Sequence, residues 1–285
     1  MASEALNVIT LVHGREAQLD NLLLGLERGT AQPAAVWVVF MNQAARVLSS
    51  DRFPIHCVEL HGEGPGLPLA AARNAVRQCQ GEQWVFLDVD CIPGADLLEG
   101  YAQALAQYPD ALHSGEVRYL PEQAETVHWT QATLNRQSVA HPLSQYRGEP
   151  GSMLPHPLFW SLNFACSRAV FERIGGFDEG YSGYGAEDTD FAFAACAQGV
   201  ELRVAAASAF HQYHPTWRPP LNHFHAIIGN AQRFHSRWSV WPMDGWLREF
   251  VELGLLDWSQ AGLQVLREPT PEEVARCFDE SRTGY

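Results

Sequence analysis

The sequence contains no lysine. Arginine supplies all 19 basic residues against 33 acidic ones, and the formal net charge at pH 7 is −14. Chemistry that depends on a lysine, such as Schiff-base formation or phosphate binding by a P-loop lysine, is therefore excluded. An acidic chain also repels nucleic-acid phosphates and anionic lipids, so we expect no nucleic-acid partner. A substrate that carries phosphate would need local arginine or a metal ion.

Long apolar runs and paired cysteines are missing as well. No window approaches the ~18 apolar residues of a membrane span, and residues 1–15 carry neither a basic stretch nor a cleavage site of small residues. The six cysteines form no CxxC pair, which excludes zinc-ribbon and thioredoxin motifs. We therefore expect a cytoplasmic protein without a transmembrane segment. A peripheral membrane contact through a partner or acceptor stays open, and so does a homodimer.

The chain does contain enough apolar sequence for a packed core, since 46% of its 285 residues are hydrophobic and 18% are charged. Short apolar runs alternate with segments of helical periodicity. Strands are expected at 6–12, 34–40, 55–60 and 83–87, and helices at 15–28, 68–79 and 94–107. This alternation predicts an α/β fold with a mostly parallel, Rossmann-like central sheet flanked by helices, whose ligands bind at the carboxyl ends of the strands.

The second half of the chain is less regular. Strands are expected at 111–120, 158–166 and 200–206, a helix at 186–198, and a long loop at 138–157 that we interpret as a lid. From residue 219 the pattern is helical and rich in aromatic residues. We therefore expect one large domain at 1–218 and a C-terminal helical extension at 219–285. The extension packs on the large domain or, as the alternative, forms a docking or dimer surface.

An acidic triplet, Asp88-Val89-Asp90, follows the apolar run that ends at Leu87. In an extended chain, residues i and i+2 face the same side, so both carboxylates would converge where the strand ends. Paired carboxylate oxygens suit Mg²⁺ or Mn²⁺. The competing interpretation is a solvated turn after a strand, which explains many such triplets.

A second acidic pair, Glu187-Asp188, follows a glycine-rich stretch that begins at Gly183. Acidic residues are common in the first turn of a helix because they favour its dipole, and this explains Asp190 well and Glu187 fairly well. The adjacent pair after flexible glycines also fits a carboxylate held against a substrate. Such a carboxylate could remove a proton as a general base.

Two histidines, His211 and His214, follow the last expected strand and could complete a metal site with Asp90. Imidazole ligands favour Mn²⁺ over Mg²⁺. With 12 histidines in the chain, a chance HxxH is the simpler explanation for the spacing alone.

Three further polar residues stand where ligands of an α/β sheet bind. Arg73 lies on the helix before the acidic triplet, and its guanidinium could contact a diphosphate or orient the aspartates. A surface arginine paired with a nearby acid is an equally good interpretation. Arg15 and Asn42 follow the first two expected strands and are candidate nucleotide contacts by position.

Taken in order, these motifs resemble the family 2 glycosyltransferases of GT-A fold. In the second half the chain is especially similar to β1,4-galactosyltransferases and polypeptide N-acetylgalactosaminyltransferases. The matching stretches are 69–74, 84–91, 161–179, 183–190 and 210–215, and the resemblance covers residues 6–215. It implies that 1–218 is a catalytic domain that transfers a sugar from a nucleotide-sugar donor to an acceptor hydroxyl with Mn²⁺ or Mg²⁺.

The resemblance also implies roles for the metal and nucleotide residues. Asp90 matches the direct metal ligand, and Asp88 the aspartate near the ribose and the metal. His214 matches the distal metal-ligating histidine, and His211 stands where the galactosyltransferases carry a second ligand. Arg15 matches an arginine that faces the nucleotide.

For the sugar substrates, the resemblance makes Asp188 the general base and Glu187 the acid that holds the donor or acceptor sugar. Sugar contacts are further expected of Trp160, Asn163 and Tyr184. Residues 39–43 lack the aspartate with which many members read uracil. UDP is therefore a first guess for the nucleotide, and the base stays open.

The expected chemistry is a single displacement with inversion at the anomeric carbon, and the acceptor is a glycan, a lipid-linked sugar or a small molecule. The alternatives are a non-catalytic nucleotide-sugar or glycan-binding protein on the same fold, a nucleotidyltransferase, and an interaction protein built around the aromatic C-terminal region. The absence of lysine argues against the nucleotidyltransferase, and the full set of acidic and histidine residues argues against the other two.

Overall fold

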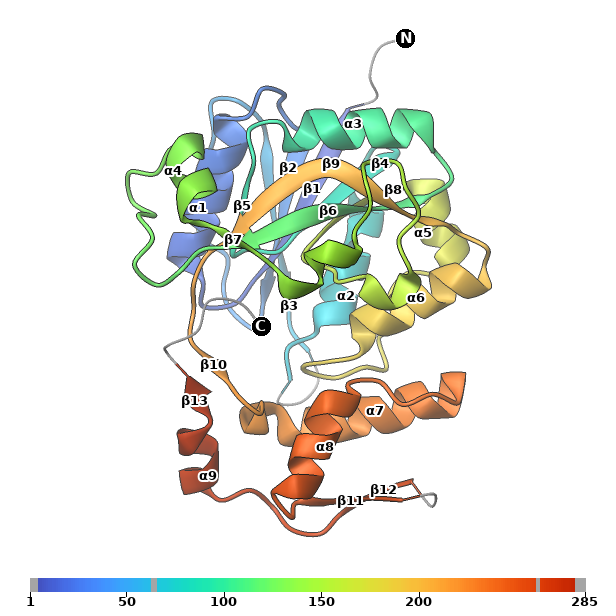
Figure 1. Cartoon of the computed structure of the whole chain (residues 1–285). Coiled ribbons are helices and arrows are strands. Elements are labelled where there is room, and N and C mark those ends of the chain that lie inside the picture. The colour runs from blue at the N-terminus through green and yellow to red at the C-terminus, as the bar shows by residue number, and fades with distance from the viewer. Residues whose placement is uncertain (1–4, 63–65, 260–261, 280–285) are drawn as a thin grey trace.

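The structure is a computed structural model that describes residues 5–62, 66–259 and 262–279. Its centre is a twisted sheet with strand order β3-β2-β1-β4-β8-β6-β9-β5, and β7 lies beside β6 (Figure 1). The strands β3, β2, β1 and β4 pair in parallel, as do β6 and β9, whereas β8, β5 and β7 pair antiparallel with their neighbours. The α/β fold with a mostly parallel sheet is therefore confirmed.

The strands of this sheet are β1 (Leu6–Val12), β2 (Ala35–Met41), β3 (Ile55–Leu60), β4 (Gln83–Leu87), β5 (Cys91–Pro93), β6 (Leu112–Tyr119), β7 (Val139–Ala140), β8 (Asn163–Ser167) and β9 (Leu202–His211). The helices around it are α1 (Glu16–Glu27), α2 (Leu69–Asn74), α3 (Leu97–Gln107), α4 (Gln131–Gln137), α5 (Arg168–Ile174) and α6 (Glu187–Ala197). Short 3₁₀ turns are η1 (Ala75–Gln78), η2 (Pro142–Tyr146) and η3 (His156–Leu158).

Helices cover both faces of the sheet, which explains why β1, β2 and β4 are mostly apolar. In β1, Val8 and Val12 join the core under α1 and α3, whereas Ile9 and Leu11 join the core under α2, α5 and α6. A strand buried on both faces needs no polar alternation, so it reads as a continuous β-branched run. This arrangement directs the polar residues of the domain to the strand ends and the loops beyond them.

Two expected elements differ from the structure. The strand expected at 158–166 begins at Asn163, because η3 occupies 156–158. The last strand, expected to end at residue 206, continues to His211 because it is paired with β6 along its length and with β5 at its end. The expected loop at 138–157 contains β7 and η2, and the sequence did not predict α4, α5 or β5.

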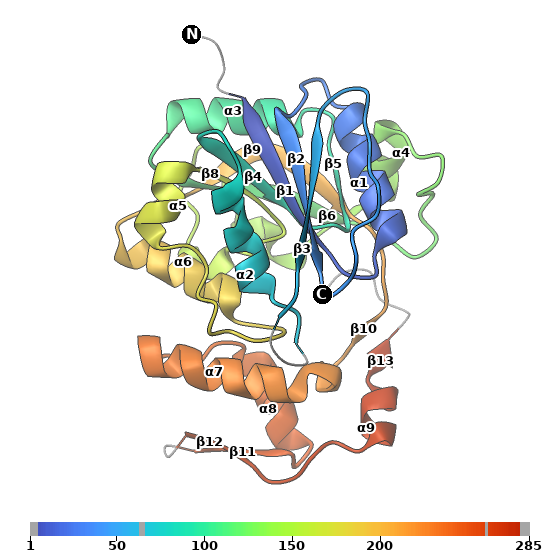
Figure 2. The ribbon, with the colours of Figure 1, turned by 180° about the vertical axis from the view of Figure 1, so that it is seen from behind.

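The C-terminal segment packs below the sheet layer in Figures 1 and 2, with α7 lying next to α6. It contains η4 (Leu221–His223), α7 (Phe224–Trp238), α8 (Asp244–Glu252), β11 (Leu256–Ser259), β12 (Gly262–Val265), α9 (Pro271–Arg276) and β13 (Phe278–Asp279), and the strand β10 (Thr216–Trp217) just before it pairs with β13. Its helices enclose a hydrophobic cluster that includes Phe224, Ile227 and Phe250. The expected helices are present, and the antiparallel hairpin β11–β12 is an addition to them.

Within the described ranges, no helix has both the length and the apolar character needed to cross a membrane.

Candidate active site

The acidic triplet lies in a turn and not in an extended strand. Strand β4 ends at Leu87, and the amide of Cys91 donates a hydrogen bond of 2.9 Å to the carbonyl of Asp88. The two carboxylates consequently face different groups: Asp90 lies by His211 and His214, and Asp88 lies by Arg73. The chain is thus not extended at 88–90, yet the two carboxylates remain close enough to interact: burial raises the pKa of Asp88, and the charge of Asp90 adds to this rise.

Asp90, His211 and His214 form a cluster whose ligand atoms all lie within 4.8 Å of one another. The Nε2 atoms of His211 and His214 are 3.6 and 3.4 Å from the carboxylate oxygens of Asp90. Pairing between β5 and β9 sets Cys91 opposite His211 and so joins two segments that are far apart in the sequence. The ring Nδ1 of His214 donates to the carbonyl of Pro215 at 3.1 Å, which orients the ring so that Nε2 faces Asp90.

The charge states of this cluster suit a divalent cation. Burial raises the pKa of Asp90, but His211, His214 and Arg15 together outweigh burial and hold it below its ordinary value. Burial lowers the pKa of His211, which favours the neutral imidazole that a metal requires. One carboxylate oxygen and two imidazole nitrogens fit Mn²⁺ better than Mg²⁺.

Arg15, directly after β1, brings a cation to this cluster. Its Nη1 lies 3.5 Å from Asp90 Oδ2, and this buried atom has no hydrogen-bond partner within the described residues. A buried N–H donor without a partner costs free energy, so the site favours an anionic acceptor at this point. A phosphate oxygen has the charge and the lone pairs to be that acceptor.

The side chain of Asn42, in contrast, makes hydrogen bonds to the backbone that follows β3. Its backbone is left-handed (φ 51°), its side-chain oxygen accepts from the amide of Gly62 at 2.9 Å, and its Nδ2 donates to the carbonyl of Gly66 at 3.4 Å. The structure therefore gives Asn42 a loop-closing position next to β2, and its amide is occupied there.

Arg73, on α2, joins the two acidic motifs. It is 5% exposed, its Nη1 donates to Glu187 Oε1 at 3.3 Å, and its Nη2 lies 3.7 Å from Asp88 Oδ1. Its guanidinium also lies 5.1 Å from the centre of the Phe177 ring. The ion pairs of Arg73 with both acidic motifs hold these motifs at a common site.

Glu187 and Asp188 occupy the first turn of α6 in different surroundings. Burial and the neighbouring Asp188 raise the pKa of Glu187 to about 7, against the opposing effect of Arg73. Its Oε2 is buried and has no hydrogen-bond partner in the described part of the chain. Burial also raises the pKa of Asp188, which makes this carboxylate a stronger base, and the amide of Thr189 donates to it at 2.7 Å.

The remaining expected sugar contacts lie in three separate places. Asn163 is buried in the sheet, where its amide donates to the carbonyls of Glu116 and Ala207 and accepts from the Tyr101 hydroxyl, so both of its N–H donors are occupied inside the fold. Tyr184 stacks on His223 and Trp246 with ring centres 4.7 and 5.7 Å apart.

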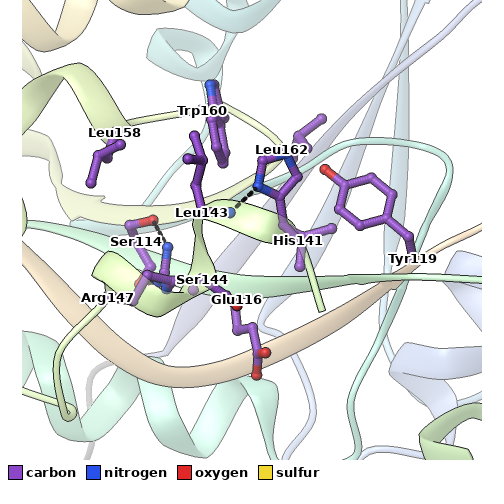
Figure 3. A pocket seen from close by; sticks show the side chains of 12 residues that line it. Ser114, Glu116, Tyr119, His141, Leu143, Ser144, Arg147, Leu158, Trp160 and Leu162 are labelled. Atoms are coloured by element: carbon purple, nitrogen blue, oxygen red, sulfur yellow. Dashed lines mark hydrogen bonds between the residues drawn. The ribbon is translucent and has the colours of Figure 1, made fainter. Parts of the chain in front are cut away.

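Trp160 lines a pocket between β6 and residues 141–147, together with His141 and Tyr119 (Figure 3). The rings of His141 and Trp160 meet edge to face with centres 4.6 Å apart. The cavity volume, counted as the space open to the centres of water molecules, is about 30 Å³.

Two site residues escaped the sequence interpretation. Gln212, between the two histidines, donates its backbone N–H to the carbonyl of Asp90 at 2.6 Å, and its side chain accepts from Asn21 on α1 at 2.7 Å. Asn230, on α7, hydrogen-bonds the loop before Glu187. Its distance from that loop in the sequence left no local pattern by which to find it.

The architecture is that of the GT-A glycosyltransferases, and the chain resembles their galactosyl- and N-acetylgalactosaminyltransferases. A family model described as the N-terminal domain of galactosyltransferase matches residues 143–215. The validoxylamine A glucosyltransferases of Streptomyces hygroscopicus subsp. limoneus and subsp. jinggangensis are 26% and 25% identical over 232 residues. Each alignment covers 71% of this chain, and 50% and 54% of the two relatives. The chain thus spans about half the length of the curated relatives it matches.

Solved structures agree on the fold. The structure of S. aureus TarS 1–349 in complex with UDP-GlcNAc superposes with a TM-score of 0.55 at 14% identity, over 86% of this chain and 76% of the TarS 1–349 chain. GalNAc-T7 with UDP, GalNAc and Mn²⁺ superposes with a TM-score of 0.53 at 15% identity, over 74% of this chain and 43% of the GalNAc-T7 chain. The mannosyltransferase PcManGT from Pyrobaculum calidifontis with GDP-Man and Mn²⁺ superposes with a TM-score of 0.50 at 18% identity, over 89% of this chain and 70% of the PcManGT chain.

Proposed function

We propose that this chain is a metal-dependent glycosyltransferase that moves a sugar, with inversion, from a nucleoside-diphosphate sugar to an acceptor hydroxyl. The observation that carries the proposal is the geometry around Asp90. A three-ligand cluster suited to Mn²⁺ lies beside the buried Nη1 of Arg15, which pairs with Asp90 but makes no hydrogen bond within the described residues. A divalent cation and a diphosphate would satisfy both features at once.

In this proposal Asp90, His211 and His214 hold the metal ion. The ion would supply positive charge that neutralises the leaving nucleoside diphosphate. Arg15 would donate to a phosphate oxygen. Asp88 lies outside the three-ligand cluster, and its ion pair with Arg73 suits a role in orienting the donor.

Asp188 is the proposed general base. The acceptor oxygen attacks the anomeric carbon while Asp188 takes its proton, and the bond from that carbon to the diphosphate oxygen breaks. Attack from the face opposite the leaving group inverts the configuration. Glu187, whose buried Oε2 has no hydrogen-bond partner among the residues that the structure describes, would accept a hydrogen bond from a sugar hydroxyl.

The donor base and the acceptor are inferred from the similar proteins. UDP is the first candidate because TarS and GalNAc-T7 were solved with UDP or a UDP-sugar. PcManGT was solved with GDP-Man, so guanine belongs in the test. The curated relatives are named as glucosyltransferases of validoxylamine A, which favours a small-molecule acceptor over a polymer.

The test is a thermal-shift panel of nucleoside diphosphates and nucleotide sugars, each with Mn²⁺, with Mg²⁺ or with EDTA. A ligand that binds the native state raises the unfolding temperature, and at 100 times its Kd it adds about 2.7 kcal/mol. We expect one nucleotide to give a shift that requires metal. Asp90→Asn, a nearly isosteric change, should remove that shift. A panel without any metal-dependent shift would contradict the proposal.

A further inference from the structure

One face of α7 contacts the acidic segment both before and after Glu187-Asp188. Asn230 bonds the loop that precedes the pair. Two residues after Asp188 in α6, Asp190 accepts from Arg237 Nη1 at 2.6 Å and from Trp238 Nε1 at 2.7 Å. Residues 230, 237 and 238 of a helix share one face, and the helix spans about 12 Å between its contacts. The acidic pair is therefore held from both sides by one rigid element.

The Asn230 side chain makes the contact on the loop side. It is 4% exposed, and its Oδ1 accepts from the amide of Ser182 at 3.2 Å. Its Nδ2 donates to the carbonyls of Ser182, Tyr184 and Gly185 at 3.1, 3.3 and 2.9 Å. Carbonyl oxygens only accept, so the amide orientation is unambiguous, and one of its two N–H groups is shared between two acceptors.

The loop held in this way has an unusual backbone. Gly183, Gly185 and Ala186 have φ angles of 68°, 101° and 70°. Ala186 is a non-glycine residue in the left-handed region, which costs free energy and persists only where the surroundings enforce it. Glu187 follows directly as the first residue of α6, so the loop conformation sets the direction of the first helical turn.

We propose that Asn230 is a positioning residue for the reaction: it holds the loop at residues 182–186 so that Glu187 and Asp188 point into the site. This inference rests on the proposed function for its catalytic part. It also assigns the C-terminal segment a share in the active site, although the family model matches only 143–215. The structural part can be tested without any substrate.

The first test uses hydrogen–deuterium exchange of the full chain. Asn230→Asp keeps the size and the acceptor for Ser182 but places a carboxylate against three carbonyls. We expect amides of residues 182–188 to exchange at least about tenfold faster while those of the central strands stay unchanged. The control is Ser236→Ala, an exposed change on the same helix. Unchanged exchange at 182–188 would overturn the proposal, and so would an equal rise throughout the chain.

The second test separates positioning from binding in the transfer assay. We expect Asn230→Asp to lower kcat by about 100-fold, as for a misplacement of ~1 Å, with KM for the donor and the Mn²⁺ requirement unchanged. Gly185→Ala disturbs the same loop directly, because an added Cβ would lie 2.7 Å from Met243 Sδ, and it should give the same pattern. A higher KM with unchanged kcat, or full activity in both variants, would overturn the proposal.

The two tests fail in distinguishable ways. If the wild-type chain binds no nucleotide and transfers no sugar, the proposed function is wrong while the exchange result still decides whether Asn230 holds the loop. If wild type transfers sugar and Asn230→Asp does too at the wild-type rate, the positioning role is wrong and the proposed function stands.

Discussion

Glu187 and Asp188 are adjacent in the first turn of α6, yet their side chains have different hydrogen-bond partners. Arg73 binds Glu187 from inside the fold, whereas Thr189 and the backbone of Ser161 donate to Asp188. Burial raises the pKa of both carboxyls, and a base with a raised pKa accepts a proton more readily. At this scale the chemistry of the site depends on single side chains.

Replacing Asp188 by Asn should leave donor binding intact and lower the transfer rate by about 10²–10⁴-fold, the usual range for loss of a general base. Steady-state kinetics together with the nucleotide-induced thermal shift measure the two effects. The exposed Asp96→Asn serves as the control. An equal loss of binding and turnover would make Asp188 a structural residue.

Replacing His214 by Ala should weaken Mn²⁺ binding by more than about tenfold, because even partners of metal ligands cost 10–100-fold. Titration with Mn²⁺, followed by electron paramagnetic resonance, gives the affinity directly. The exposed His128→Ala is the matched control. An unchanged titration would remove His214 from the ligand set.

Glu187 should also make stability depend on pH. Its pKa is raised from 4.5 to about 7 in the folded chain, so the folded state binds more protons than the unfolded state between these values. Stability due to this group is thus present at low pH and is lost as the pH rises toward 7. Glu187→Gln should therefore raise Tm at pH 8 without metal by about 2–4 °C, the shift expected for ~1 kcal/mol. The gain should vanish near pH 4.5, and a gain independent of pH would contradict this.

At the scale of elements, the link between α6 and α7 depends on Asp190. This buried carboxylate accepts from Tyr181, Arg237 and Trp238. Asp190→Ala should lower the free energy of unfolding by about 2–3 kcal/mol, since it removes charge-assisted hydrogen bonds and leaves donors unpaired. Asp244→Ala breaks an exposed i,i+4 pair with Arg248 and should cost less than about 0.5 kcal/mol. Urea unfolding compares the two, and equal costs would argue against the link.

The strands β1 and β4 are buried on both faces, and their short apolar runs with clear ends lie at the expected residues. The edge strand β3 also lies at the expected residues, although its side chains are half-buried or exposed. The elements β5, α4 and α5 were missed because their form depends on pairing and packing with distant segments, which periodicity does not record.

The site also has a part that sequence position predicts and a part that depends on distant contacts. The structure brings together Arg15, Asp90, His211 and His214, as expected if strand ends meet at one edge of a sheet. The loop role of Asn42 and the buried position of Asn163 depend on contacts between segments far apart in the chain. No spacing rule predicts such contacts.

For the whole molecule, we propose that 1–218 and 219–285 form two structural regions but one cooperative unit. The contacts of α7 with the acidic segment cross this boundary, as does the pairing of β10 with β13. Thermal unfolding should give one transition that coincides for far-UV circular dichroism and tryptophan fluorescence. Trp84 lies in the large region and Trp246 in the smaller one, so two separate transitions would be detected and would contradict this prediction.

The face of α7 that carries Asn230, Arg237 and Trp238 also limits how such enzymes can be recombined. A chimera joined at residue 218 would exchange this face together with the rest of the C-terminal segment and would lose its matched contacts with Ser182–Gly185 and Asp190. A crossover after Ser239, where α7 has ended, keeps them. Exchange from α8 onward is therefore the safer design for altering this end of the protein, provided that Met243 and Trp246, which lie against Gly185 and Tyr184, are retained.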